Sequence, residues 1–204
     1  MAFSRFFGDF HDRLIYQRRI REISMAIAPL LPQGLILDVG CGNGEFGAYM
    51  MTLRKDIRII GLEVMLRPAS AIPVVIYDGG ELPLMDKCVS GVIMADTLHH
   101  TRQPDRVMRE CLRVAREAVV VKDHFYENEF QKFLLRLLDL GGNVAHGVPS
   151  IYNYFKREQW AAMLNEVEGR EVYRSEEIEG QYPGFFQPIL GRGIQFVSKV
   201  SVSG

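Results

Sequence analysis

The sequence lacks an excess of charge of either sign, and it lacks any long apolar run. Among its 204 residues, 24 are Lys or Arg and 25 are Asp or Glu, which gives a formal net charge of −1. A near-neutral chain does not have the basic footprint of a nucleic-acid-binding domain, so a nucleic-acid partner is disfavoured. No stretch approaches the roughly 18 uninterrupted apolar residues of a membrane span.

Cysteine is also scarce. The three cysteines, Cys41, Cys88 and Cys111, are an odd number without metal spacing or a disulfide framework. They predict reduced thiols in a cytoplasmic protein. The N-terminal residues MAFSRFFGDFHDR mix charges with aromatics and lack the continuous apolar run and small-residue cleavage site that are typical of a signal peptide. Because 48% of the residues are hydrophobic, we expect one folded domain over residues 1–204.

Apolar segments alternate with helical segments along the first part of the chain. Strands are expected at 35–39, 57–62, 72–77, 89–95 and 118–122, and helices at 10–31, 45–54 and 104–116, with a short helical piece opening at Pro68. These strands are apolar throughout, which indicates a mostly parallel sheet covered by helices on both faces. A helix at about 127–140, a short helix around Trp160 and an antiparallel pair of strands at 171–175 and 193–200 are expected to follow.

Two of these helices have apolar faces at helical spacing. The first predicted face consists of Tyr16, Ile20, Ile23, Ile27 and Leu30. The second, in the helix at 127–140, consists of Phe130, Phe133, Leu134, Leu137 and Leu138. Both faces are expected to be buried.

The segment LDVGCGNGEFG (37–47) places three glycines between a buried strand and a helix. Glycine allows a positive φ and lets a ligand approach the backbone closely. The helix that follows presents free N–H donors, and ligands of parallel sheets bind beyond the carboxyl ends of the strands. We therefore expect this loop to hold a cofactor.

A dinucleotide is one cofactor that the loop allows. The segment from Gly42 to Gly47 matches the pattern G-x-G-x-x-G, and Glu63 follows Gly42 by 21 residues, as in nicotinamide-dependent oxidoreductases. Asp38 argues against this alternative, because a carboxylate at the strand end suits a cationic ligand better than a pyrophosphate. The pattern also begins late, since residues 38–41 precede its first glycine.

The segment ILDVGCGNGEF (36–46) resembles the first motif of class I S-adenosylmethionine-dependent methyltransferases. The similarity extends to GLEV (61–64), YDGGELPL (77–84) and MADTLHH (94–100), and so covers residues 35–122. It implies an α/β, Rossmann-like, doubly wound seven-stranded sheet with an antiparallel last strand. It also implies S-adenosylmethionine as cofactor and S-adenosylhomocysteine as product. Residues 1–34 would then form an N-terminal helical lid, 35–122 the cofactor half and 123–204 the acceptor side.

The resemblance also assigns the cofactor-binding residues. They are Asp38, Gly40, Cys41, Gly42, Gly44, Glu63, Val64, Asp78, Gly79 and Ala95. The three loop glycines would lie beneath the methionine part of the cofactor, with Asp38 near its amino group. Glu63 would accept hydrogen bonds from both ribose hydroxyls. Asp78 would bind the adenine amino group, with Gly79 beside the ring.

A sulfonium methyl group needs no protein nucleophile, because the acceptor attacks it in line. The main contribution of the protein is to hold the two at near-attack distance. His124, Asp96 and His100 are the candidate general bases or positioning groups, whereas His99 is expected to be packed in the structure. No metal is expected, since the spacing of these residues has no metal signature.

The segments that the resemblance assigns to the acceptor are rich in aromatic residues. Tyr152, Tyr154 and His146 are expected to orient a small acceptor of apolar or aromatic character. Several arginines between residues 13 and 21 leave RNA open as an alternative, and the preceding phenylalanines leave open a membrane surface with a lipid-like acceptor. A non-catalytic S-adenosylmethionine-binding protein is a further alternative, and both a monomer and a homodimer remain open.

Overall fold

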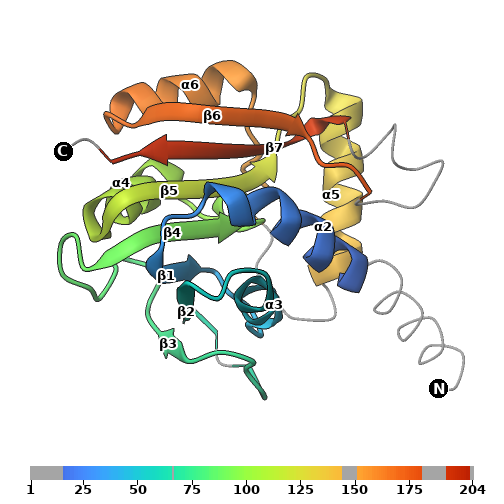
Figure 1. Ribbon diagram of the computed structural model, residues 1–204. Helices are drawn as coiled ribbons and strands as arrows, with labels where there is room; N and C mark the ends of the chain where they lie inside the picture. Colours follow the sequence, from blue (N-terminus) through green and yellow to red (C-terminus); the bar gives the residue numbers. More distant parts are fainter. Residues whose placement is uncertain (1–15, 66, 144–150, 181–191, 203–204) are drawn as a thin grey trace, which may run out of the picture.

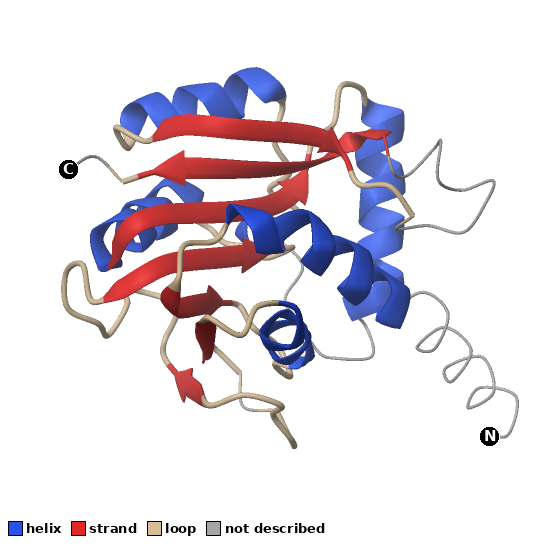
Figure 2. Ribbon diagram, viewed as in Figure 1, coloured by secondary structure: helices blue, strands red, loops and turns tan. Residues whose placement is uncertain are grey.

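A seven-stranded sheet organises the chain in the computed structural model, which describes residues 16–65, 67–143, 151–180 and 192–202 (Figures 1 and 2). Its strand order is β3-β2-β1-β4-β5-β7-β6. The strands are β1 (Gly34–Val39), β2 (Ile57–Glu63), β3 (Val74–Ile76), β4 (Val89–Ala95), β5 (Ala115–His124), β6 (Arg170–Glu177) and β7 (Arg192–Ser201).

The direction of the strands confirms the expected fold class. Strand β1 pairs in parallel with β2 and β4, and further parallel pairs join β2 to β3 and β4 to β5. Strand β7 is antiparallel to both of its neighbours, β5 and β6. The chain winds outward from β1 in one direction and from β4 in the other. In such sheets ligands bind at the carboxyl ends of the strands where the order reverses.

Helices cover both faces of this sheet (Figure 2). They are α2 (Gln17–Ile27), α3 (Glu45–Leu53), α4 (Pro104–Val114), α5 (Glu129–Asn143) and α6 (Arg157–Glu166), with the 3-10 turns η2 (Ala28–Leu30) and η3 (Leu98–His100). One core packs α2 and α3 residues such as Ile27 and Met50 against the sheet, and the other packs Met108 of α4 and Trp160 of α6. Two separate cores of this kind are what a sheet with two apolar faces requires.

Most of the face predicted for the N-terminal helix is buried, as expected. Ile20, Ile23 and Ile27 are buried, whereas Tyr16 is 38% exposed. Residues 10–15 of the predicted helix lie outside the described residues.

The prediction of a helical piece at Pro68 was wrong. Residues 67–73 have no helix, and the third strand is shorter than predicted. A residue that precedes a proline disfavours the helical backbone conformation, and Ile72 precedes Pro73. The segment instead runs beside the glycine loop, where Ala71 N–H donates to the carbonyl of Asn43 at 2.8 Å.

Helix α4 and strand β5 meet earlier than predicted. The helix ends at Val114, and the strand continues to His124. Asp123 and His124 therefore belong to the sheet, which places their backbone in a regular register opposite Phe196 and Gln195 of β7.

The predicted buried face of α5 was wrong at three of its five residues, whereas Leu134 is half-buried against the cluster of Leu135 and Tyr154, and the side chain of Leu138 lies outside the described structure. Phe130, Phe133 and Leu137 are 72%, 63% and 54% exposed, whereas Leu135 is 2% exposed. The inward face instead runs through Leu135 and Asp139, which are four residues apart. Apolar residues on both sides of this helix made the sequence ambiguous about which side faces the protein.

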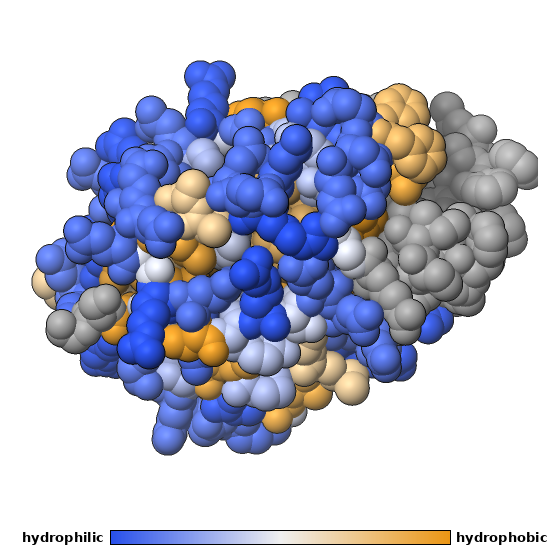
Figure 3. Space-filling model, turned by 90° about the horizontal axis from the view of Figure 1, so that it is seen from above, coloured by the Kyte–Doolittle hydropathy of each residue, from blue (hydrophilic) through white to orange (hydrophobic). Residues whose placement is uncertain are grey.

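The surface seen from above is mostly hydrophilic, with separate apolar side chains (Figure 3). Scattered apolar residues of this kind are normal on a folded domain. Among the described residues, every helix is too short or too polar to span a membrane.

Candidate cofactor and acceptor site

The glycine loop between β1 and α3 adopts the conformation that its sequence predicts. Gly40, Gly42 and Gly44 have φ angles of +76°, +57° and +75°. A Cβ atom on Gly40 would lie 2.4 Å from Cγ2 of Thr97, and one on Gly44 would lie 2.6 Å from Cγ1 of Ile72. A Cβ atom on Gly42 would meet no atom within 4 Å. The backbone at Gly42 is therefore the open part of the loop, where a ligand can approach.

Asp38 lies beneath this loop near the end of β1. The residue is 2% exposed, and its Oδ2 atom has no hydrogen-bond partner among the described residues. Burial, together with the nearby Glu63 carboxylate, raises the pKa of Asp38 to about 7. A buried carboxylate of this kind is poorly stabilised by the protein alone and is suited to a cationic ligand group.

Glu63 ties the end of β2 to the same loop. Its Oε2 atom accepts a hydrogen bond from the N–H of Gly42 at 2.9 Å. Its Oε1 atom accepts hydrogen bonds from the N–H groups of Val64 at 2.9 Å and Met65 at 3.2 Å. A carboxylate has about four lone-pair positions, so further donors such as ribose hydroxyls can still be accepted.

The residues after β2 and β3 form an adjoining wall. Val64 is 52% exposed, and a Cβ atom on Gly79 would lie 3.4 Å from its Cγ1 atom. Asp78 accepts a hydrogen bond from the N–H of Gly80 at 2.8 Å, which is the turn geometry favoured by Asp. Cys41 is buried, and a Cβ atom on Gly61 would lie 2.3 Å from its Sγ atom, so the thiol packs against β2.

Helix α2 borders the opposite side of the loop. Tyr16 donates its hydroxyl to Oδ1 of Asn43 at 3.4 Å, and Gln17 donates to Glu45 at 3.2 Å. Arg19 reaches Asp96 at the end of β4, with 2.9 Å between Nη2 and Oδ2. The described part of the predicted N-terminal lid therefore contacts both the glycine loop and the β4 terminus.

Charged groups gather at the ends of β4 and β5. Ala95 ends β4, and Asp96, which follows it, pairs with Arg19 and with the fully buried ammonium of Lys122. Burial would raise the pKa of Asp96, but Lys122 and Arg19 hold it well below its usual range. Burial lowers the pKa of Lys122. Because the sequence AVVVK ends an apolar strand with a lysine, it offered a signal for this buried cation that the sequence analysis missed.

His124 is buried beside this ion pair. Its Nε2 atom is 3.5 Å from Nζ of Lys122, and its Nδ1 atom is 3.6 Å from Oδ1 of Asp96. Burial and the neighbouring Lys122 lower the pKa of His124. His124 is therefore a neutral imidazole near neutral pH.

His99 occupies the centre of a second buried group. Its Nδ1 atom is 2.6 Å from Oδ1 of Asp123, and its Nε2 atom is 3.0 Å from Oδ2 of Asp139. Burial opposes protonation, but Asp123 and Asp139 outweigh it and raise the pKa of His99 to about 10. The expectation that His99 is packed is met. Asp139 was missed, because a single acid within an apolar helix carries no recognisable pattern.

Of the three predicted acceptor residues, Tyr154 and Tyr152 are described and differ in burial. Tyr154 is 5% exposed, and its hydroxyl donates to Asp139. Its ring stacks on His99 with 5.0 Å between centroids. Tyr152 is half-buried, with its ring 6.2 Å from that of Tyr154. His146 lies outside the described residues.

His100 lies next to His99, with 4.0 Å between the ring centroids. Burial and the neighbouring His99 lower the pKa of His100. Ligand atoms of His99, His100 and Asp139 lie within 4.8 Å of one another, as do those of His99, Asp123 and His124. The absence of a metal remains a prediction, since both groups have the residue types that ligate divalent metals.

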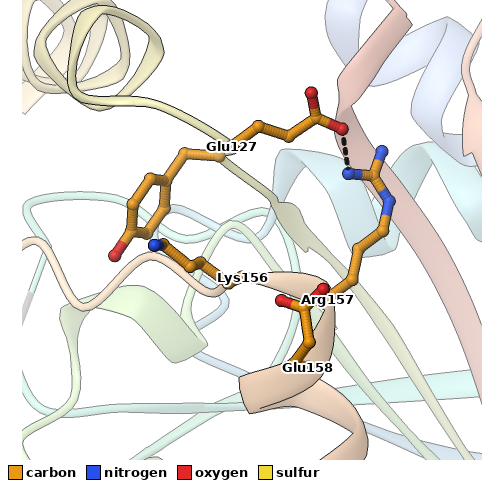
Figure 4. Close-up of a pocket in the computed structure, with 5 residues that line it drawn as sticks. Glu127, Lys156, Arg157 and Glu158 are labelled. Carbon is orange, nitrogen blue, oxygen red and sulfur yellow. Dashed lines mark hydrogen bonds and ion pairs between the residues drawn. The ribbon is translucent and has the colours of Figure 1, made fainter.

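A polar pocket of about 330 Å³ lies beyond β5, between the loop that leads to α5 and the start of α6 (Figure 4). It is lined by Tyr126, Glu127, Lys156, Arg157 and Glu158. Arg157 pairs with Glu127 across it and with Glu176 of β6. Its lining has two cationic and two carboxylate side chains, so this pocket differs from the apolar acceptor pocket that the sequence predicts.

Known proteins resemble this chain both in the sequence around the glycine loop and in the fold. Residues 37–121 match the family model of a methyltransferase domain. This match supports a class I S-adenosylmethionine-dependent methyltransferase. The matched residues begin just before Asp38 and include the glycine loop, Glu63, Asp78 and Asp96, and the family implies S-adenosylmethionine as the cofactor.

Solved structures of methyltransferases share this fold at low sequence identity. An S-adenosylmethionine-dependent methyltransferase from Thermotoga maritima is 19% identical, with a TM-score of 0.67 and 98% of each chain covered. One from Aquifex aeolicus is 15% identical, with a TM-score of 0.61 and coverage of 95% of this chain and 93% of its own. A Haloferax volcanii protein, solved in complex with the Trm112 methyltransferase activator, is 12% identical with a TM-score of 0.69 and coverage of 100% and 96%.

The residues around the glycine loop fit S-adenosylmethionine. The unpartnered Oδ2 atom of Asp38 suits the cofactor's ammonium group, and the open backbone at Gly42 leaves room for its methionine part. A pyrophosphate would instead lie near two carboxylates, Asp38 and Glu63, which repel it.

Two glycine substitutions are expected to separate folding from cofactor binding. Gly42→Ala places its methyl group in open space, so the free energy of unfolding should fall by only about 1–2 kcal/mol from the positive φ. Its affinity for S-adenosylhomocysteine should fall at least ~10-fold. Gly40→Ala adds a clash with Thr97 and should lose about 2–5 kcal/mol. Chemical denaturation and calorimetric titration measure both effects, and wild-type affinity in Gly42→Ala would refute the assignment of the open site.

Proposed function

We propose that this protein transfers the methyl group of S-adenosylmethionine to a small acceptor of apolar or aromatic character. The observation that carries the proposal is the buried, unpartnered carboxylate oxygen of Asp38 beneath the open backbone of Gly42. Together they suit a ligand that is cationic near the loop. The proposed cofactor contacts are those of Glu63 with the ribose, Asp78 with the adenine amino group, and Val64 and Gly79 with the ring.

The proposed acceptor side is the aromatic group beyond β4 and β5. The ring of Tyr154 stacks on His99 and meets His124 edge-on, with 6.1 Å between the latter centroids. Flat, largely apolar side chains of this kind suit an acceptor with an apolar or aromatic body. The bound cofactor would supply an activated methyl group, and the protein would align the acceptor with it.

The three proposed catalytic residues differ in what they can do. His124 and His100 have lowered pKa values, so each is neutral near pH 7 and can accept a proton from the acceptor. Asp96 is a weak base, because Lys122 and Arg19 stabilise its charged form. Its proposed role is to hold these groups at the end of β4.

Binding and transfer experiments test the proposal directly. At a hundredfold excess over its dissociation constant, S-adenosylhomocysteine should stabilise the protein by about 2.7 kcal/mol, which is about 5–10 °C in Tm for a domain of this size. The same excess of NAD should leave Tm unchanged, and Gly42→Ala should lose the response. Incubation with methyl-labelled S-adenosylmethionine and a metabolite extract should then yield a labelled small molecule in mass spectra. Stabilisation by NAD alone would favour an oxidoreductase, and ligand binding without transfer would favour a non-catalytic binding protein.

A further inference from the structure

We propose that His99 is a positioning residue, whose imidazolium clamps helix α5 to the carboxyl edge of the sheet and so fixes Tyr154 at the acceptor side. The inference rests on the proposed function, because it assigns the clamp a role in acceptor transfer. Its partners are Asp123 on β5 and Asp139 on α5.

Both ring nitrogens of His99 face a carboxylate, Nδ1 in a hydrogen bond and Nε2 in an ion pair. His99 is fully buried, and its Nδ1 and Nε2 atoms lie 2.6 Å from Asp123 and 3.0 Å from Asp139. The Nδ1 atom hydrogen-bonds to Asp123, whereas the Nε2 atom lies within ion-pair distance of Asp139 without hydrogen-bond geometry, so its attraction to Asp139 depends on a positive charge on the ring. Asp123 also accepts the backbone N–H of His99 at 3.2 Å and that of His124 at 2.8 Å, so its carboxylate is fixed in place. Two carboxylates held on opposite sides of one buried ring favour the charged form.

The clamp extends from Asp139 to the acceptor side. The hydroxyl of Tyr154 donates to the same Asp139 oxygen that faces His99. The backbone of Asn153 donates to the carbonyl of His99 at 2.8 Å, and its side chain donates to Thr101 at 2.8 Å. The segment around Tyr154 is therefore joined to η3 through its backbone and through Asp139. Loss of the His99 charge would leave Asp139 beside buried Asp123 without a cation between them.

Ionisable groups face His99 from every packed element. They are His100 on η3, Asp123 and His124 on β5, Asp139 on α5 and Tyr154. The carboxylates raise the pKa of His99 to about 10, whereas the pKa values of His100 and His124 are lowered. Across the neutral pH range, His99 is then the charged member of the three histidines.

The first experiment observes the clamp without any acceptor. In ¹⁵N spectra of the histidine rings of the full-length protein, His99 should carry a proton on both nitrogens at about pH 7.5. Asp139→Asn should lower the pH at which it titrates. In hydrogen exchange, His99→Gln and Asp139→Asn should speed exchange of the α5 amides at least ~10-fold. Asp105→Asn, on helix α4, is the matched control and should leave α5 unchanged.

The second experiment asks whether the clamp serves the acceptor. In both clamp variants, label transfer from S-adenosylmethionine into a metabolite extract should fall at least ~10-fold, while the affinity for S-adenosylhomocysteine stays within about threefold of wild type. A folded variant with wild-type transfer would overturn the positioning role. A His99 ring with one proton would overturn the clamp. So would one-to-one binding of Zn²⁺ or Mn²⁺ that Asp139→Asn abolishes, which would make His99 a metal ligand. If wild type fails to bind S-adenosylhomocysteine while the α5 results hold, only the proposed function fails.

Discussion

Lys122→Met is expected to lower the free energy of unfolding by about 2–4 kcal/mol, the largest stability loss among the charged residues of the site. The lysine is fully buried, and its ammonium donates to Asp96. Methionine fills a similar volume but leaves Asp96 with Arg19 as its described cationic partner. Breaking a fully buried pair typically costs about 3–5 kcal/mol, and the 28% exposure of the Asp96 side chain reduces that cost, because water can reach the carboxylate.

Chemical denaturation measures this loss of stability. A control variant and a double variant then show how much of it comes from the Lys122–Asp96 pair. Lys199→Met, on the neighbouring strand β7, changes a half-buried lysine and should alter stability by less than about 1 kcal/mol. Lys122→Met combined with Asp96→Asn should be more stable than the sum of the two single losses predicts, because the orphaned charge is removed. Strict additivity would show that the two side chains do not stabilise one another.

Asp38→Asn is expected to raise the free energy of unfolding of the ligand-free protein at pH 8 and to lower its affinity for the cofactor. The pKa of Asp38 is raised to about 7 in the folded protein, well above its value in an unfolded chain. The folded state therefore holds its proton more tightly, so this residue's contribution to stability is present below about pH 4 and is lost as the pH rises through about 7. As the pH rises from about 4 to above about 7, the free energy of unfolding of the wild type should fall by about 1–3 kcal/mol relative to that of the variant.

Denaturation curves at about pH 4 and pH 8 test the stability half of this prediction, with Asp105→Asn as the control that should keep the wild-type pH dependence. Calorimetric titration tests the binding half. Loss of a charge-assisted hydrogen bond to the cofactor's ammonium should weaken S-adenosylhomocysteine binding about 10–100-fold. A variant with wild-type affinity would remove Asp38 from the cofactor site, whatever its effect on stability.

The sheet could be predicted because local sequence determines it. The apolar runs at β1, β2, β4 and β5 allow only strands that are covered on both faces, and the glycines after β1 mark the loop at the reversal of strand order. Even the antiparallel end of the sheet followed from the change of pattern after residue 122. Pro73 could have warned against the helix predicted at Pro68.

The acceptor side could not be predicted in the same way, because its groups meet only through tertiary packing. Asp139 and His99 are 40 residues apart in sequence, and nothing near either residue indicates the other. Helix α5 turns Leu135 and Asp139 toward the protein and leaves Phe133 exposed. Periodicity finds a helical face, but it does not choose between two faces that are both apolar.

The position of β7 has a consequence for biosynthesis. This strand is the last along the chain, yet it lies between β5 and β6. Strand β5, which ends with Asp123 and His124, therefore keeps one unpaired edge until residues 192–201 have left the ribosome. The β1–β4 layer can assemble on the nascent chain before then, whereas the β5 terminus acquires its final hydrogen bonds only afterwards.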